Sequence, residues 1–174
     1  PTTVPILPLK NTVLFPGVVI PITAGRDKSI KLIKDANKSD KTIGVVAQLN
    51  SELENPGAQD IYKMGTVAQI LRVLKMPDGN TTIIIQGKKR FNIKSILEDQ
   101  PYLRANIEPV QDDNPNKNDK EFHATIDSIK DLALQIIQEN PNIPTEAAFA
   151  IKNIQTPSFL INFVAVSYTH LTLP

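Results

Sequence analysis

The stretch YKMGTVAQILRVLKMPDGNTTIIIQ, residues 62–86, contains two β-prone segments on either side of a turn. Its two arms are rich in β-branched residues, and they flank the run Met-Pro-Asp-Gly-Asn at residues 76–80. Asp-Gly adopts the positive φ values of a tight turn, and Pro77 fixes the corner before it. We therefore predict a β-hairpin with strands over residues 62–75 and 81–86 and an exposed tip between them.

Further short strands are predicted on both sides of this hairpin. The apolar run within residues 43–49 predicts a central strand, Gly87 predicts a bulge or bend, and residues 91–97 predict a separate strand after it. In residues 102–109 apolar and polar side chains alternate, so one face of this strand is expected to be buried. Short strands broken by Gly and Pro favour a barrel or sandwich up to about Val110.

One short helix is predicted within this β-rich part. Residues 27–36 place Ile30, Ile33 and Ala36 on one face, which is the spacing of an amphipathic helix. About three turns of helix are enough to plug one end of a barrel.

A helical part follows a polar stretch. Residues 112–120 have no apolar period and predict a linker. From Glu121 onward apolar side chains recur every three or four positions, as on one face of a helix. Asn118 and Glu121 have the spacing of a capping box, and Asn140-Pro141 predicts the end of this helix.

Two more helix starts are predicted at Thr145 and at Thr156-Pro157, where proline takes the first helical position. The predicted organisation is thus a β-barrel unit over residues 1–111 and the start of a helical subdomain over residues 121–166.

The composition limits the possible functions. With 19 Lys and Arg against 18 Asp and Glu, the formal net charge of +1 argues against nucleic acid as a partner. The absence of cysteine excludes disulfides, thiolate nucleophiles and sulfur-ligated zinc. No apolar run reaches the roughly eighteen residues of a membrane span, and no signal peptide is visible, so we expect a cytoplasmic protein with no membrane partner.

Several segments resemble the amino-terminal, substrate-binding domain of ATP-dependent Lon proteases. They follow the order and spacing of that family, and they are VPILPLKNTVLFPGVVIPI (4–22), GRDKSI (25–30), MGTVAQILRVLKMPDG (64–79), QGKKRFNIKSI (86–96), YLRANIEPV (102–110) and IPTEAAFAIKNIQTPSFLINFVA (143–165). The resemblance extends to about Val166. Residues 167–174 do not resemble the family, and we expect them to be an end introduced by cloning or a frameshift.

The resemblance implies an α+β fold, in which a PUA-like β pseudo-barrel with one short helix is followed by a small α-helical subdomain. It implies a non-catalytic domain that recognises unfolded or damaged proteins and supports assembly with other Lon subunits into a hexamer. ATP with Mg²⁺, and Ser-Lys peptide cleavage, would belong to domains of the parent protease beyond this chain. No cofactor is expected in this domain.

No catalytic or metal-binding residue is predicted. The glycines of residues 79 and 87 lack the spacing of a phosphate-binding Walker loop. His123 and His170 have no carboxylate partners at metal-ligand spacing, and His123 is interpreted as a helix-surface residue. The basic run Lys88-Lys89-Arg90 could contact phosphate, but we interpret it as a solvated turn that protects a strand edge from aggregation.

Two apolar segments are candidate binding sites for polypeptide. Pro and Gly place the first in a predicted loop, and the second lies at the predicted hairpin tip. The candidate residues are Leu14, Phe15, Pro16, Val18, Leu74, Met76 and Pro77. Alternatively, Phe15 is a core plug that anchors its turn, and for Met76 exposure and core packing both stay open.

A second function is open at this stage. A stand-alone PUA-like module would bind RNA or a small ligand in place of a polypeptide. The sequence of the native gene past residue 166 distinguishes the two functions. A Walker loop and a Ser-Lys peptidase there would indicate a domain of a Lon protease, whereas a stop would indicate a stand-alone module.

Overall fold

The computed structural model describes residues 2–111, 119–140 and 146–172. The chain divides into two compact units, with the boundary between Gln111 and Asp112. The first unit holds one helix and six strands: β1 (Thr3–Leu9), β2 (Val19–Ala24), α1 (Asp27–Lys38), β3 (Thr42–Ala47), β4 (Met64–Lys75), β5 (Thr81–Glu98) and β6 (Arg104–Pro109).

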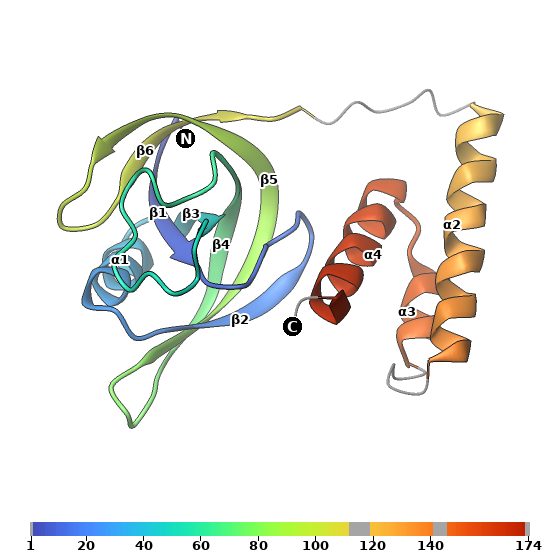
Figure 1. The fold of residues 1–174 in the computed structure, drawn as a ribbon, viewed down its shortest axis with the longest axis horizontal. Helices are drawn as coiled ribbons and strands as arrows, with labels where there is room; N and C mark the ends of the chain where they lie inside the picture. Colours follow the sequence, from blue (N-terminus) through green and yellow to red (C-terminus); the bar gives the residue numbers. More distant parts are fainter. Residues whose placement is uncertain (1, 112–118, 141–145, 173–174) are drawn as a thin grey trace. The chain divides into compact units, whose positions relative to one another are not determined.

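The strands of the first unit form a closed ring with one additional strand (Figure 1). The sheet order is β2-β5-β4-β3-β1-β6, and β5 also pairs with β6, which closes the ring. β1 and β3 are parallel, whereas the other pairs are antiparallel. β2 lies outside the ring and pairs with the first half of β5. This arrangement confirms the predicted α+β pseudo-barrel with one short helix.

The long strand β5 pairs with β4 and β6 in the ring and with β2 outside it. It is continuous over 18 residues, so the prediction of two strands separated at Gly87 was wrong. The predicted bulge is present one residue later, where Lys88 and Lys89 of β5 lie opposite the single residue Val67 of β4. The basic run therefore lies in a strand, and the prediction of a turn at this place was also wrong. A bulge lets one long strand bend and serve two parts of the barrel.

Two apolar clusters fill the first unit. In β5 the residues Ile83 and Ile85 are completely buried, and Phe91 is the largest side chain buried at the other end. In β6 the predicted alternation is confirmed, since Ala105 and Ile107 are buried between exposed or half-buried neighbours.

The helix α1 covers one end of the first cluster, but its buried face differs from the prediction. Ile33 and Ala36 are buried as expected, whereas Ile30 is only half-buried. Leu32, which the periodicity did not select, is 1% exposed. The buried face of α1 is therefore shifted by about one residue from the predicted face.

The second unit consists of helices in its described part: α2 (Lys120–Glu139), α3 (Glu146–Asn153) and α4 (Pro157–Thr172). α4 starts at Pro157 as predicted. Its backbone is helical through Thr172, although the last residues were expected to be foreign to the domain. Residues 112–118 of the predicted linker (112–120) and the predicted cap at Thr145 lie outside the described residues, and Lys120 at the end of that linker is the first residue of α2.

The start of α2 is capped by Asp119, not by the predicted Asn118, which lies outside the described residues. The Asp119 carboxylate accepts hydrogen bonds from the backbone N–H groups of Glu121 at 3.0 Å and Phe122 at 3.1 Å. These bonds satisfy two of the donors that a helix leaves free at its first turn.

Replacing this cap is expected to destabilise the helical unit. We predict that Asp119→Ala lowers its free energy of unfolding by about 1 kcal/mol, because the two N–H groups lose their acceptor. Urea unfolding followed by far-ultraviolet circular dichroism measures the change. Asp127→Ala removes an exposed acid from the middle of the same helix and is the matched control. An equal effect of both substitutions would contradict the capping role.

Candidate functional site

The first predicted binding segment packs against the barrel. Leu14 is 4% exposed and belongs to the apolar core, so its prediction as a surface contact was wrong. Phe15 and Pro16 are half-buried, and Val18 is half-buried against the same core. The hydroxyl of Thr66 donates a 2.6 Å hydrogen bond to the Leu14 carbonyl, which holds the segment in place. Leu14 is therefore not available to a partner, whereas Phe15, Pro16 and Val18 are partly exposed.

The second predicted segment is a hairpin tip, as expected, and it is exposed. Leu74 and Met76 are 46% and 43% exposed, and Pro77 is also exposed. The Met76 N–H donates to the Asn80 carbonyl at 2.9 Å, and Gly79 adopts a φ of 87°. Of the two alternatives for Met76, exposure is the one observed. In Figure 1 the tip of β4 and β5 extends beyond the rest of the first unit.

The hairpin tip continues into the part of the sheet that β2, β5 and β4 form. We call the side of these three strands that points away from the core the outer face. Along β2, β5 and β4 alternate residues point into the core, as Ile20, Ile85 and Ile70 do. The residues between them point away from it. The register places these in three cross-strand rows, namely Val19–Gln86–Gln69, Pro21–Ile84–Arg72 and Thr23–Thr82–Leu74.

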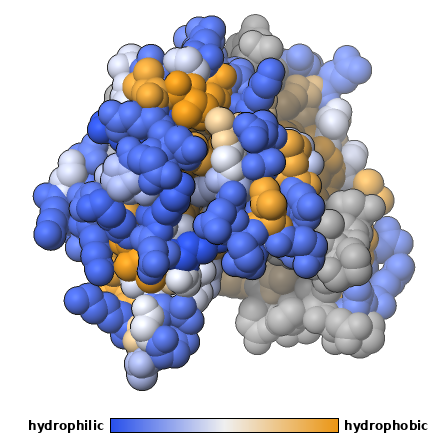
Figure 2. Space-filling model, turned by 60° about the vertical axis from the view of Figure 1, so that its left-hand side comes forward, coloured by the Kyte–Doolittle hydropathy of each residue, from blue (hydrophilic) through white to orange (hydrophobic). Residues whose placement is uncertain are grey.

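Apolar side chains are prominent on this outer face. Val19 is 49% exposed, Pro21 is exposed, and Ile84 is half-buried between them and β4. Leu71 is 47% exposed at a second irregularity, where β4 has one residue more than β5. On the face of the molecule drawn in Figure 2, apolar side chains form separate clusters among hydrophilic ones. Of the apolar residues on the outer face, only Leu74 was predicted from the sequence as a contact residue.

The free edge of β2 is unsuited to pairing with another strand. Within the described residues β2 pairs only with β5, and the Gly87 N–H donates to the Val18 carbonyl at 2.9 Å. Antiparallel pairing alternates, so the backbone groups of Val19, Pro21 and Thr23 point to the free edge. Pro21 has no N–H there, which interrupts the row of donors. A ligand of this surface would therefore contact side chains.

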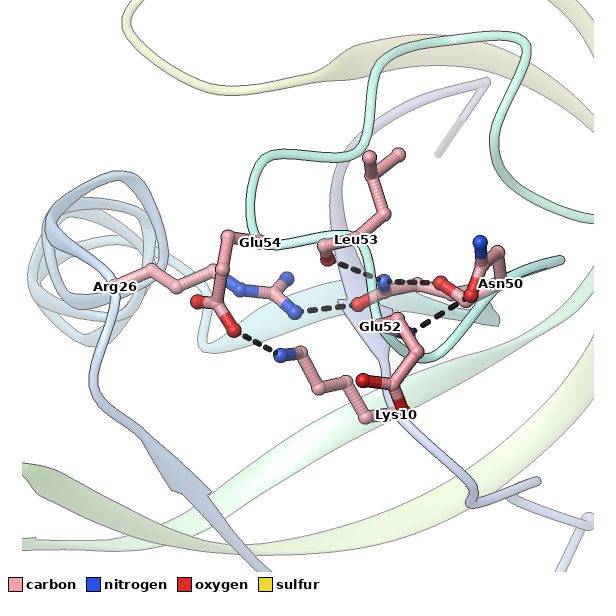
Figure 3. A network of polar contacts seen from close by, with 7 residues as sticks. Lys10, Arg26, Asn50, Glu52, Leu53 and Glu54 are labelled. Carbon is pink, nitrogen blue, oxygen red and sulfur yellow. Dashed lines mark hydrogen bonds and ion pairs between the residues drawn. The ribbon is translucent and has the colours of Figure 1, made fainter.

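A cleft of about 940 Å³ lies beside the start of α1. It is lined by the end of β1, by β2, by the first turn of α1 and by Glu54 and Asn55. Lys10 and Glu54 form an ion pair of 2.7 Å (Figure 3). Arg26 donates a 2.5 Å hydrogen bond to Gln48 Oε1, and Gln48 Nε2 donates to the carbonyls of Asn50 and Leu53.

The charges of this cleft influence each other. Burial lowers the pKa of Arg26, and the charge of Glu54 opposes that shift. The hydrogen bond and the charge of Lys10 lower the pKa of the Glu54 carboxyl group. The cleft was not predictable from the sequence, because Lys10, Arg26 and Glu54 come from three separate segments. The local sequence provides little signal, because Arg26 and Lys28 flank the acidic Asp27 at the start of α1.

The described part of the chain offers no arrangement for bound-metal chemistry. No group of three or more His, Asp or Glu side chains comes together there. His123 is exposed on α2, as predicted. None of the helices in the described ranges is both long and apolar enough to span a membrane.

Comparison with known proteins identifies the family. Residues 3–171 match the model of the ATP-dependent protease La (LON) substrate-binding domain. The Lon protease of Flavobacterium johnsoniae is 65% identical over 165 residues, and that of Cytophaga hutchinsonii is 52% identical over 165 residues. Each alignment covers 95% of this chain but 20% of the relative, so the chain spans about a fifth of the length of these proteases.

Solved structures show the same fold. The N-terminal domain of Mycobacterium avium complex Lon protease has a TM-score of 0.73 at 23% identity, covering 92% of this chain and 80% of that one. A Lon N-terminal domain protein from Xanthomonas campestris has a TM-score of 0.59 at 15% identity, covering 99% of both chains. With the family match over residues 3–171, these findings show that the chain belongs to the family of Lon substrate-binding domains.

Proposed function

We propose that this domain recognises unfolded or damaged polypeptides through the outer face of β2, β5 and β4. The observation that carries the proposal is the set of exposed apolar side chains on this face, with Val19 and Pro21 on β2, Leu71 and Leu74 on β4, and Met76 at the tip. Exposed apolar groups gathered on one surface are typical of interaction sites. Unfolded chains expose the complementary apolar segments.

The character of the outer face favours weak and unselective binding. Met76 has an unbranched, polarisable side chain that adapts to partners of different shape. Arg72, Thr23 and Thr82 lie between the apolar residues, and they keep the surface hydrated when it is free. A protease that acts on many damaged proteins needs such tolerance, because a contact specific for one sequence would exclude the others.

The activity of the whole protein is proposed on the same basis. The relatives are Lon proteases, and this chain corresponds to about a fifth of their length. We propose that ATP hydrolysis with Mg²⁺, and Ser-Lys peptide cleavage, take place in domains outside this chain. Assembly with other Lon subunits into a hexamer and a cytoplasmic location are part of the same proposal. The domain would then deliver substrates and would perform no chemistry itself.

A binding titration tests the proposed function. The 174-residue chain is titrated with a permanently unfolded polypeptide, reduced and carboxymethylated lactalbumin, and with the native form of the same protein. We expect saturable binding of the unfolded form only, and weaker binding to Met76→Ser because an apolar contact is lost at the tip. Equal binding of both forms, or no binding at all, would refute the proposal.

A further inference from the structure

The outer face combines its apolar residues with positive charge. Arg72 and Lys88 provide this charge, and Lys89 lies next to Lys88 at the bulge. The sequences of β2 and β4 contain no Asp or Glu, and that of β5 contains only Glu98 at its last position, opposite Arg104 of β6. The chain as a whole has a net charge of only +1, so strands with basic but almost no acidic residues are a local feature.

Register and a hydrogen bond place both cations on the outer face. Arg72 lies opposite Ile84, which points away from the core. Lys88 donates a 2.6 Å hydrogen bond from Nζ to Oε1 of Gln86, two residues earlier on the same side of β5. The four positions from Ile84 to Lys88 span roughly 13 Å of extended strand. Arg72 and Lys88 are therefore well separated, and the row of Gln86 with the apolar Val19 lies between them.

Both cations are available to a ligand. Arg72 and Lys88 are exposed, and neither forms an ion pair with another residue in the described ranges. The hydrogen bond to Gln86 uses one of the three donors of the Lys88 ammonium group, and a guanidinium group has five. The acid of the hairpin, Asp78, lies in the turn, where its carboxylate accepts hydrogen bonds of 3.0 and 2.8 Å from the backbone and side chain of Asn80.

The cleft on the other side of β2 does not reverse this charge. Its lining has one more basic than acidic residue, namely Lys10, Arg26 and Lys28 against Asp27 and Glu54. Glu54 is already paired with Lys10 at 2.7 Å. A ligand that lies across the outer face and over β2 therefore meets an excess of positive charge throughout.

We propose that the outer face prefers unfolded segments in which acidic side chains alternate with apolar ones, and that Arg72 and Lys88 determine this preference. The inference rests on the proposed function, because it takes unfolded polypeptide as the ligand. Every second side chain of an extended segment points to the same side. Two acids with one apolar residue midway between them thus span roughly 13 Å, which matches the spacing of the two cations. The carboxylates contact Arg72 and Lys88 while the apolar residue contacts Val19 or Ile84.

The preference concerns charge and not one sequence. A contact between two exposed charges changes an affinity by only a few-fold, so segments without acids still bind through their apolar residues. Segments rich in Lys and Arg bind more weakly, because like charges repel across an interface. The domain thus accepts many unfolded chains and ranks them by charge.

Three peptides that differ only in charge test the proposal. They are acetyl-Glu-Thr-Leu-Thr-Glu-Thr-Leu-Thr-Glu-amide and its counterparts with Gln or Lys in place of every Glu. Amide NMR spectra of the 174-residue chain measure their binding. We expect saturable shifts on the outer face, with roughly tenfold tighter binding of the Glu peptide than of the Lys peptide at low salt. The ratio should approach one at about 1 M salt, where the Debye length falls to about 3 Å.

Charge variants of the chain assign the preference to the two residues. Arg72→Gln with Lys88→Gln should bring the affinity ratio of the Glu and Lys peptides close to one, and Arg72→Glu with Lys88→Glu should invert it. Lys34→Gln with Lys38→Gln removes the same net charge from exposed positions of α1 and is the matched control, which should keep the roughly tenfold ratio. An unchanged ratio in Arg72→Gln with Lys88→Gln, or an equal loss in the control, would overturn the proposal.

The outcomes separate the charge preference from the proposed function. If the three peptides shift the amides of the outer face with equal affinity, the preference is overturned and the proposed function stands. If none of them shifts these amides, both are overturned. A short oligothymidylate is the remaining probe. Tighter binding of this polyanion than of the Glu peptide would also overturn the proposal, since the cations would then serve nucleic acid.

Discussion

Gly87→Ala is expected to lower the free energy of unfolding of the barrel unit by about 3 kcal/mol, since overpacking and lost backbone hydrogen bonds act together. A Cβ atom at this position would lie 2.3 Å from the Phe15 carbonyl oxygen and 3.0 Å from its carbon. Both are backbone atoms, which cannot turn aside as a side chain can. The strand and the Leu14–Val18 segment would have to separate.

Moving β5 away from the Leu14–Val18 segment would also weaken backbone hydrogen bonds. Gly17 N–H donates to the Gly87 carbonyl at 2.9 Å, and Gly87 N–H donates to the Val18 carbonyl at 2.9 Å. These bonds lead directly into the pairing of β2 with β5, so the substitution also disturbs the outer face.

Urea unfolding measures the effect, with Gly57→Ala as the control. At Gly57 the nearest atom to an added Cβ is 3.5 Å away on the Asp60 side chain, which is ordinary contact. Its effect should stay within about 0.5 kcal/mol. If Gly87→Ala were as stable as the control, the close contact of the Phe15 segment with β5 would be wrong.

The double substitution Val19→Ser with Leu74→Ser is expected to weaken the binding of unfolded polypeptide by roughly tenfold or more, because two apolar contacts are lost. The two residues lie on the outer strands of the outer face and are 49% and 46% exposed. Since they are exposed in the free domain, its stability should change by no more than about 0.5 kcal/mol per residue. Fluorescence anisotropy of a labelled unfolded polypeptide measures the affinity.

The matched control is Leu49→Ser with Leu97→Ser. These leucines are 54% and 50% exposed in the same unit but lie outside the outer face. They test whether any exposed apolar residue of this unit contributes to the binding of unfolded polypeptide. A loss of affinity in the control equal to that of Val19→Ser with Leu74→Ser would argue for unspecific adhesion and against the outer face.

Local chemistry made much of the barrel predictable. The Asp-Gly turn at residues 78–79 and its β-branched arms predicted the hairpin, and the alternation in residues 102–109 predicted the buried face of β6. The parallel pairing of β1 with β3 and the antiparallel pairing of β1 with β6 were not predictable from periodicity, because they join segments far apart in the chain. The family resemblance implied the pseudo-barrel but not these pairings.

The candidate sites were also predictable only where the signal is local in the sequence. The tip with Met76 was predicted because turn residues imply exposure. Leu14 was misplaced because Pro16 and Gly17 suggested an open loop, whereas Gly87 lets this loop lie directly against β5.

The most direct test of the outer face as a polypeptide-binding surface is site-specific photo-crosslinking. Benzoyl-phenylalanine replaces Leu74 in one variant and Leu97 in another, and both are irradiated with the same unfolded polypeptide. These positions are similarly exposed, at 46% and 50%. We expect an adduct from position 74 that an excess of unlabelled unfolded polypeptide suppresses, and none from position 97. Equal adducts from both positions, or an adduct from position 97 alone, would contradict the account.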